Sequence, residues 1–165
     1  MHPDGDGLKC DYCLSFYFPE KDDSGVRVLG EPSDHACPIC KLPLVDAVIA
    51  AIHILYCTQC RSMLVPMQVF QVLIEKLEAA QGGAAIQPAV GNKDLSRRID
   101  CPHCHQPMDA HFYAGPGNVV IDSCDQCMLI WLDHGELMRI VRAPDDRNHA
   151  ALFNAAPDQY DDSGG

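Results

Sequence analysis

The cysteines of this chain occur only as five Cys-x-x-Cys pairs, and this pattern restricts the fold more than any other feature. The pairs are Cys10/Cys13, Cys37/Cys40, Cys57/Cys60, Cys101/Cys104 and Cys124/Cys127. A turn of this spacing directs two thiolates toward one point, and two such turns form a tetrahedral cage for a metal ion. Four pairs therefore predict two four-cysteine sites, and the fifth pair needs a separate account.

Structural metal explains these cysteines better than disulfides do. The start of the chain, MHPDGDGLK, is polar and predicts no secretory leader, and the longest apolar stretch, 48–56, is too short to cross a bilayer. We therefore expect a cytoplasmic protein without membrane contact, where reduced thiols are more often metal ligands than bridges. Because much of the apolar content is cysteine and alanine, we also expect a thin core that bound metal must stabilise.

Residues 37–74 and 101–141 carry the same features in the same order, which indicates an internal duplication. Each unit has a Cys-Pro-x-Cys pair, a spacer, a second pair, an apolar tripeptide and a helical pattern. The duplication assigns the ligands of the two sites. The first site takes Cys37, Cys40, Cys57 and Cys60, and the second takes Cys101, Cys104, Cys124 and Cys127.

The spacers between the pairs, of 16 and 19 residues, suit β-hairpins. In the second unit, strands are predicted over 108–113 and 119–122, on either side of the glycine-containing turn 114–118. In the first unit, the spacer fits either a tighter hairpin or a partly helical segment. Apolar spacing predicts one helix over 67–80, and a capping box of Asp133 and Glu136 predicts a second helix that Pro144 ends.

Residues 101–141 resemble the transcription-factor-IIB-type zinc-finger family, a family of zinc ribbons. The resemblance is carried by CPHC, CDQC and WLDHGEL, which occur in that order. It implies that Cys101, Cys104, Cys124 and Cys127 bind zinc. It also implies that Trp131, Leu132, Asp133, Gly135, Glu136 and Leu137 belong to the helix-start motif of the family.

We expect structural roles for that motif. Trp131 should be a packing anchor over the ribbon, and Asp133 and Glu136 should cap the helix. Gly135 should be small so that the helix can approach the Cys-x-x-Cys turn, which is called a knuckle below. The first unit departs from the pattern, because Leu64, Pro66 and Val69 stand where the family has Trp, Asp and Glu. It should keep the metal and the fold, whereas a function tied to the motif is not expected there.

The sequence thus predicts a small, metal-stabilised α+β fold. Its tandem zinc ribbons have four-cysteine knuckle pairs on β-hairpins, and each ribbon is followed by a short α-helix. The predicted segments are an N-terminal part (1–36), a degenerate ribbon with its helix (37–81), a flexible linker (82–98), a second ribbon with its helix (99–143) and an acidic, disordered tail (144–165).

Three arrangements are considered for the odd pair, Cys10/Cys13. In the first, the pair forms a third metal site with His35 and one more donor, such as His2 or a carboxylate. In the second, it shares a metal with Cys37/Cys40 in a RING-like cross-brace, which the duplication argues against. In the third, it binds no metal or acts as a redox-reactive dithiol.

Sites closed by four cysteines predict structural Zn²⁺, two ions or three, and no enzymatic activity, because a catalytic zinc keeps an open position. An iron–thiolate electron carrier is a lesser alternative, since glycine usually follows the second cysteine in such proteins and does not here. A protein-interaction or adaptor module is the favoured function. Nucleic-acid binding is the main alternative, but the net charge of −11 opposes it, and the best basic cluster is only Lys93, Arg97 and Arg98.

Overall fold

The computed structural model describes residues 1–81, 96–113 and 119–142. Three expectations lie wholly or largely outside these ranges: the linker, of which only 96–98 are described, the turn 114–118 and the acidic tail. In the described ranges, neither helix combines the length and the apolar character needed to span a membrane.

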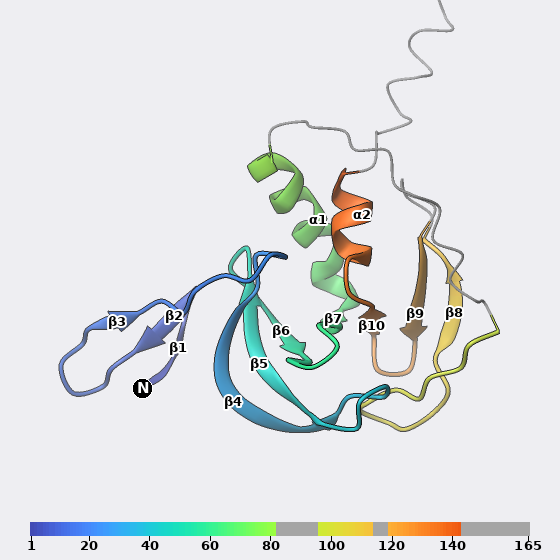
Figure 1. Ribbon diagram of the computed structural model, residues 1–165, viewed down its shortest axis with the longest axis horizontal. Helices are drawn as coiled ribbons and strands as arrows, with labels where there is room; N and C mark the ends of the chain where they lie inside the picture. The colour runs from blue at the N-terminus through green and yellow to red at the C-terminus, as the bar shows by residue number, and fades with distance from the viewer. Residues whose placement is uncertain (82–95, 114–118, 143–165) are drawn as a thin grey trace, which may run out of the picture.

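Seven strands form one antiparallel sheet that both units share (Figure 1). The first unit contributes β5 (Pro43–Ile49), β6 (Ile52–Tyr56) and β7 (Met63–Pro66), and α1 (Met67–Gln81) follows directly. The predicted N-terminal part adds β4 (Arg27–Ala36) at the edge of the sheet next to β5. The second unit contributes β8 (Asp109–Phe112), β9 (Val120–Cys124) and β10 (Leu129–Leu132), followed by α2 (Glu136–Arg142). The strand order is β4-β5-β6-β7-β10-β9-β8, so the two units meet between β7 and β10. The predicted small α+β fold with two metal-stabilised ribbons is confirmed.

The junction between the units has a local two-fold axis. Strands β7 and β10 are antiparallel and hold equivalent positions in the two units, each directly after its second knuckle. Leu64 pairs with Trp131, and these two residues also lie equally far from their knuckles. An antiparallel pair centred on equivalent residues relates its strands by two-fold rotation, so the duplicated units pack as a symmetric dimer would.

The sheet has an apolar core on each face because its side chains alternate along β7 and β10. Met63 and Val65 face the helices, where residues of both units and both helices form one buried cluster. Leu64 and Trp131 face the other way, into a second cluster that contains or contacts all eight cysteines of the two units. The expectation of a thin core is therefore wrong, because both units contribute residues to each of the two clusters.

The first-unit spacer forms the tighter of the two predicted alternatives. Ile49 pairs with Ile52, and the two residues between them, Ala50 and Ala51, have φ angles of 49° and 62°. Two left-handed residues in a two-residue loop are typical of a type I′ turn, which suits the twist of a hairpin but usually selects Asn-Gly.

Residues 2–17 build an arm that projects from the sheet (Figure 1). Its strands β1 (His2–Asp4), β2 (Gly7–Lys9) and β3 (Phe16–Tyr17) form a separate antiparallel sheet. The segment between β3 and β4 connects the arm to the body. Tyr56 Oη donates a 2.6 Å hydrogen bond to Asp22 Oδ2, Arg27 donates one to the carbonyl of Pro19, and Val26 is buried in the core on the helix side of the sheet.

Candidate metal centres

All five Cys-x-x-Cys pairs fold into the same kind of turn. In each one, the residue after the second cysteine has a φ angle in the left-handed region. These residues are Leu14 (59°), Lys41 (62°), Arg61 (60°), His105 (60°) and Met128 (55°). Backbone bonds close the turns in the same way: Lys41 N donates to the Cys37 carbonyl at 2.9 Å, and Arg61 N donates to the Cys57 carbonyl at 2.8 Å. The turn directs both sulfurs of a pair to one side.

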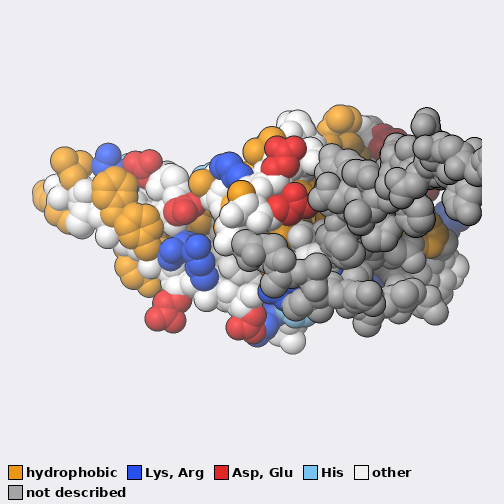
Figure 2. Space-filling view, turned by 90° about the horizontal axis from the view of Figure 1, so that it is seen from above, with side chains coloured by type: hydrophobic (Ala, Val, Ile, Leu, Met, Phe, Trp, Pro, Cys, Tyr) orange, Lys and Arg blue, Asp and Glu red, His pale blue; other side chains and the backbone are white. Residues whose placement is uncertain are grey.

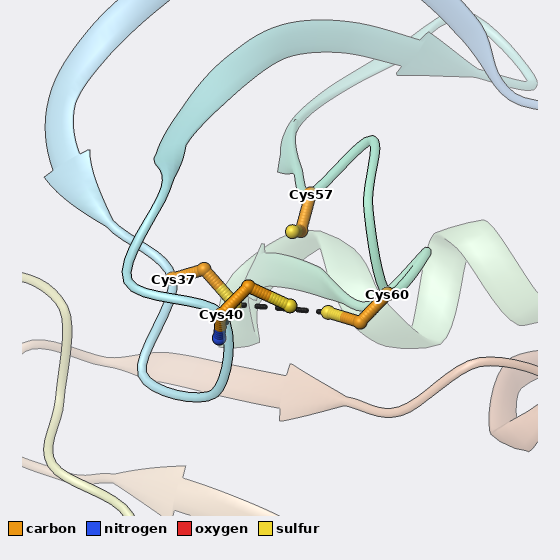
Figure 3. A group of neighbouring side chains, drawn as sticks. All are labelled: Cys37, Cys40, Cys57 and Cys60. Carbon is orange, nitrogen blue, oxygen red and sulfur yellow. Dashed lines mark hydrogen bonds between the residues drawn. The ribbon is translucent and has the colours of Figure 1, made fainter.

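The first centre consists of Cys37, Cys40, Cys57 and Cys60, whose side chains turn toward one another (Figure 3). The knuckle before β5 supplies two of them, and the knuckle between β6 and β7 supplies the others. Cys37 Sγ lies 3.6 Å from Cys60 Sγ. Sulfurs around a tetrahedral Zn²⁺ with bonds of about 2.3 Å lie about 3.8 Å apart, so this donor set fits zinc.

The second centre repeats this arrangement with Cys101, Cys104, Cys124 and Cys127. Cys104 Sγ lies 3.7 Å from Cys124 Sγ, again the spacing of a zinc cage. All four donor sulfurs of each set lie within 4.8 Å of one another. The predicted assignment of eight cysteines to two sites thus matches the structure, and the sites fit two Zn²⁺ ions.

Within one cage, the pKa values of the thiols shift in opposite directions. Burial opposes ionisation of Cys60, but hydrogen bonds with Ser62 outweigh it and lower the pKa of Cys60 to about 7. Burial raises the pKa of Cys37 to about 11, and the hydrogen bond with Cys60 raises the pKa of Cys40 to about 12. In the second centre, burial raises the pKa of Cys127 to about 12. A divalent cation is therefore needed to hold four thiolates at this spacing, and its binding must displace protons.

The helix-start motif of the second unit has the expected structural character, with two changes in detail. Trp131 is fully buried, and its indole Nε1 donates a 3.1 Å hydrogen bond to Asp133 Oδ1. Asp133 N donates to Glu136 Oε2 at 2.8 Å, which is one half of the predicted capping box. Leu132 and Leu137 are buried in the helix-side core.

The first change concerns Gly135. A Cβ atom there would meet nothing within 4 Å, but the φ angle is +84°. The backbone conformation, and not a close approach of the helix, accounts for glycine at this position. The second change is that α2 begins at Glu136, whereas an N-cap at Asp133 would start the helix at His134.

Arg97 is not part of a free basic patch. Its guanidinium lies 3.0 Å from Asp122 Oδ2 and 2.8 Å from Asp133 Oδ2, and Asp122 is fully buried. Arg97 thus fixes the start of the second unit to β9 and to the helix-start motif. Of the other two residues predicted for this patch, Arg98 is exposed and Lys93 lies outside the described ranges.

The structure does not bring His35 to Cys10 and Cys13. The His35 ring lies edge-on to His103 of the second unit, with a centroid distance of 5.3 Å. Within the described ranges, only the two four-cysteine sets bring three or more His, Cys, Asp or Glu donors together. Since Cys37/Cys40 is paired with Cys57/Cys60, the cross-brace arrangement is not formed either.

A groove of about 380 Å³, which the sequence does not predict, lies beside the junction of the units. Leu55, Leu64 and Leu129 are among its apolar lining residues. His35, His53, His103 and Asp46 are among its polar ones. These residues come from distant parts of the chain, so no local pattern could have indicated that they line one groove.

The fold and the sites define a tandem zinc-ribbon protein with four cysteines at each site. Residues 100–143 match the family model described as "Transcription factor zinc-finger", so the second unit is a zinc ribbon of this family. The four-cysteine cluster of the first unit is consistent with a tandem copy. Comparisons with curated proteins and with solved structures find no match to the chain.

Proposed function

We propose that this zinc-binding protein is a non-enzymatic interaction module that binds a short peptide segment of another protein. Each metal cage is closed by four protein thiolates, so a bound zinc has no open position for water or substrate. The metal then acts on folding, and recognition is left to the surface that the cages hold in place. A reducing, cytoplasmic compartment is part of this proposal, because oxidised thiols could not form the cages.

The observation that carries the proposal is the groove at the junction of the units. Its volume of about 380 Å³ suits one or two large side chains, its lining includes three leucines, and residues of both metal-held ribbons line it. Asp46 in the wall and the net charge of −11 favour a segment in which Lys or Arg flanks an apolar residue. The same charge opposes a phosphate backbone, and Arg97 is already bound to two carboxylates.

Peptide display on the zinc-loaded protein tests this proposal. We expect enriched sequences to combine an apolar residue with basic neighbours. His53, an exposed residue of the groove wall, provides the test variant, and the exposed His111 on β8 provides a control of the same type on the far edge of the sheet. His53→Lys should weaken peptide binding about tenfold or more, because it opposes a basic ligand, and His111→Lys should not change it.

Equal affinity of both variants for the selected peptides would remove the groove from the proposal. A mobility-shift assay with single- and double-stranded nucleic acids over a range of salt addresses the other class of partner. Micromolar binding that weakens steeply with salt would favour nucleic-acid recognition over the peptide.

A further inference from the structure

The knuckle of Cys10 and Cys13 is folded like the knuckles that ligate metal. Cys10 N donates to the Ser15 carbonyl at 2.9 Å, as Cys57 N does to the Ser62 carbonyl. Leu14 N donates to the Cys10 carbonyl at 2.9 Å, which matches the bond from Arg61 N to Cys57. Leu14 also adopts the left-handed conformation that all ligating knuckles share, at a steric cost that an unconstrained loop would avoid.

The likeness to the Cys57/Cys60 knuckle extends to the sulfur environment. Cys13 Sγ lies 2.8 Å from Ser15 Oγ, and Cys60 Sγ lies 3.3 Å from Ser62 Oγ. A hydroxyl in this position supports a thiolate by hydrogen bonding, which is the role that residues around a metal ligand serve. The odd pair therefore has the backbone and the supporting serine of half a zinc site.

The described part of the chain does not supply the other half. The remaining eight cysteines are used four by four in the two cages, and His35 lies against His103. Exposure points the same way. In both cages the first cysteine of a pair is buried and the second is half-buried, whereas Cys10 is half-buried and Cys13 is exposed. Cys10 and Cys13 are thus more exposed than the corresponding cysteines of the cages, as expected of a knuckle that no second knuckle covers.

The surroundings of the pair fit a second protein surface. Large apolar side chains within the knuckle and directly after it are exposed: Tyr12 (100%), Leu14 (63%), Phe16 (50%), Tyr17 (56%) and Phe18 (54%). They gather on the projecting arm, at the end of the molecule farthest from α2 (Figures 1 and 2). Exposed aromatic patches of this kind mark interaction sites on proteins.

We propose that the arms of two copies of this chain face each other across a two-fold axis and bind a Zn²⁺ ion through Cys10 and Cys13 of each copy. Each copy supplies one knuckle, and two knuckles are what each cage in the body contains. The first and the second Cys-x-x-Cys pair of each unit have the same backbone turn, so two identical knuckles can form a cage. The two-fold arrangement of β7 and β10 shows that this fold already pairs equivalent elements in that way.

Native mass spectrometry and sedimentation of the full chain in reducing buffer with zinc test the proposal. We expect a dimer that carries five zinc ions, which is two for each body and one between the arms. The Cys10→Ser/Cys13→Ser variant should be a monomer with two zinc ions and an unchanged circular dichroism spectrum of the body. Cys13→His keeps a zinc donor and should restore much of the dimer, which a purely structural role of Cys13 would not predict.

Several results would overturn the proposal. A wild-type monomer with two zinc ions would show that the knuckle is empty, and a monomer with three would show that donors within the chain complete the site. A dimer that the double serine variant retains would be held by other contacts. A dimer that forms only when the reductant is omitted, and that carries four zinc ions, would be a disulfide product.

Discussion

The Ala50–Ala51 turn of the first ribbon allows the backbone energetics of this fold to be tested with one substitution. Both residues have positive φ angles, of 49° and 62°, and Ala51 is exposed. A non-glycine residue in this conformation costs about 1 to 2 kcal/mol, and glycine removes that cost. Glycine also makes the unfolded chain more flexible, which costs about 0.4 to 1 kcal/mol. Ala51→Gly should therefore raise the free energy of unfolding by about 0.5 to 1 kcal/mol.

Urea denaturation of the zinc-loaded protein at a fixed free zinc concentration, followed by far-ultraviolet circular dichroism, measures this change. Ala79, which is exposed near the end of α1, provides the matched control. Ala79→Gly is the same chemical change in an ordinary helical conformation and should lower stability by up to about 1 kcal/mol. If Ala51→Gly lowers stability as much as the control does, the left-handed turn and the reasoning from it are refuted.

Three further predictions concern Tyr56, Gly135 and the cysteine thiols. Tyr56→Phe removes the 2.6 Å hydrogen bond to Asp22 that attaches the arm, and should lower the free energy of unfolding by about 1 to 2 kcal/mol in the same assay; an unchanged stability would contradict it. Gly135→Ala should cost about 1 to 2 kcal/mol because of the φ angle of +84°, and Gly135→Asn should cost less; equal losses would point to packing instead. The apparent zinc affinity should rise with pH, because burial raises the pKa of Cys37 to about 11 and zinc must displace the thiol protons. Chelator competition between about pH 6 and about pH 8 measures this affinity. An affinity that does not change over this range would contradict the prediction.

The sequence was sufficient to predict the features that depend on local spacing. Both four-cysteine sets followed from the repeat, and the helix predicted over 67–80 is α1 (Met67–Gln81). The predicted strands of the second spacer correspond to β8 and β9. In each case the signal lies in a short window, where cysteine spacing or apolar periodicity is a direct consequence of the local structure.

Features that depend on contacts between distant segments were not predictable in this way. The apolar tripeptides became β7 and β10, and their pairing creates the shared core that a reading of either unit alone underestimates. Arg97 falls in the predicted linker and basic cluster, because its partners, Asp122 and Asp133, lie far along the chain and no local pattern indicates them. The predicted third metal site takes His35 because an imidazole is a suitable zinc donor, but the curved β4 strand carries this residue to His103 of the other unit.

The central claim is that both body sites are closed by four thiolates, which makes their metal structural and leaves function to the protein surface. X-ray absorption at the zinc edge of the Cys10→Ser/Cys13→Ser variant measures the body sites alone. We predict a single shell of four sulfurs at about 2.3 Å for both ions. A shell of nitrogen or oxygen at about 2.0 to 2.1 Å would show an open or mixed site and would contradict the account.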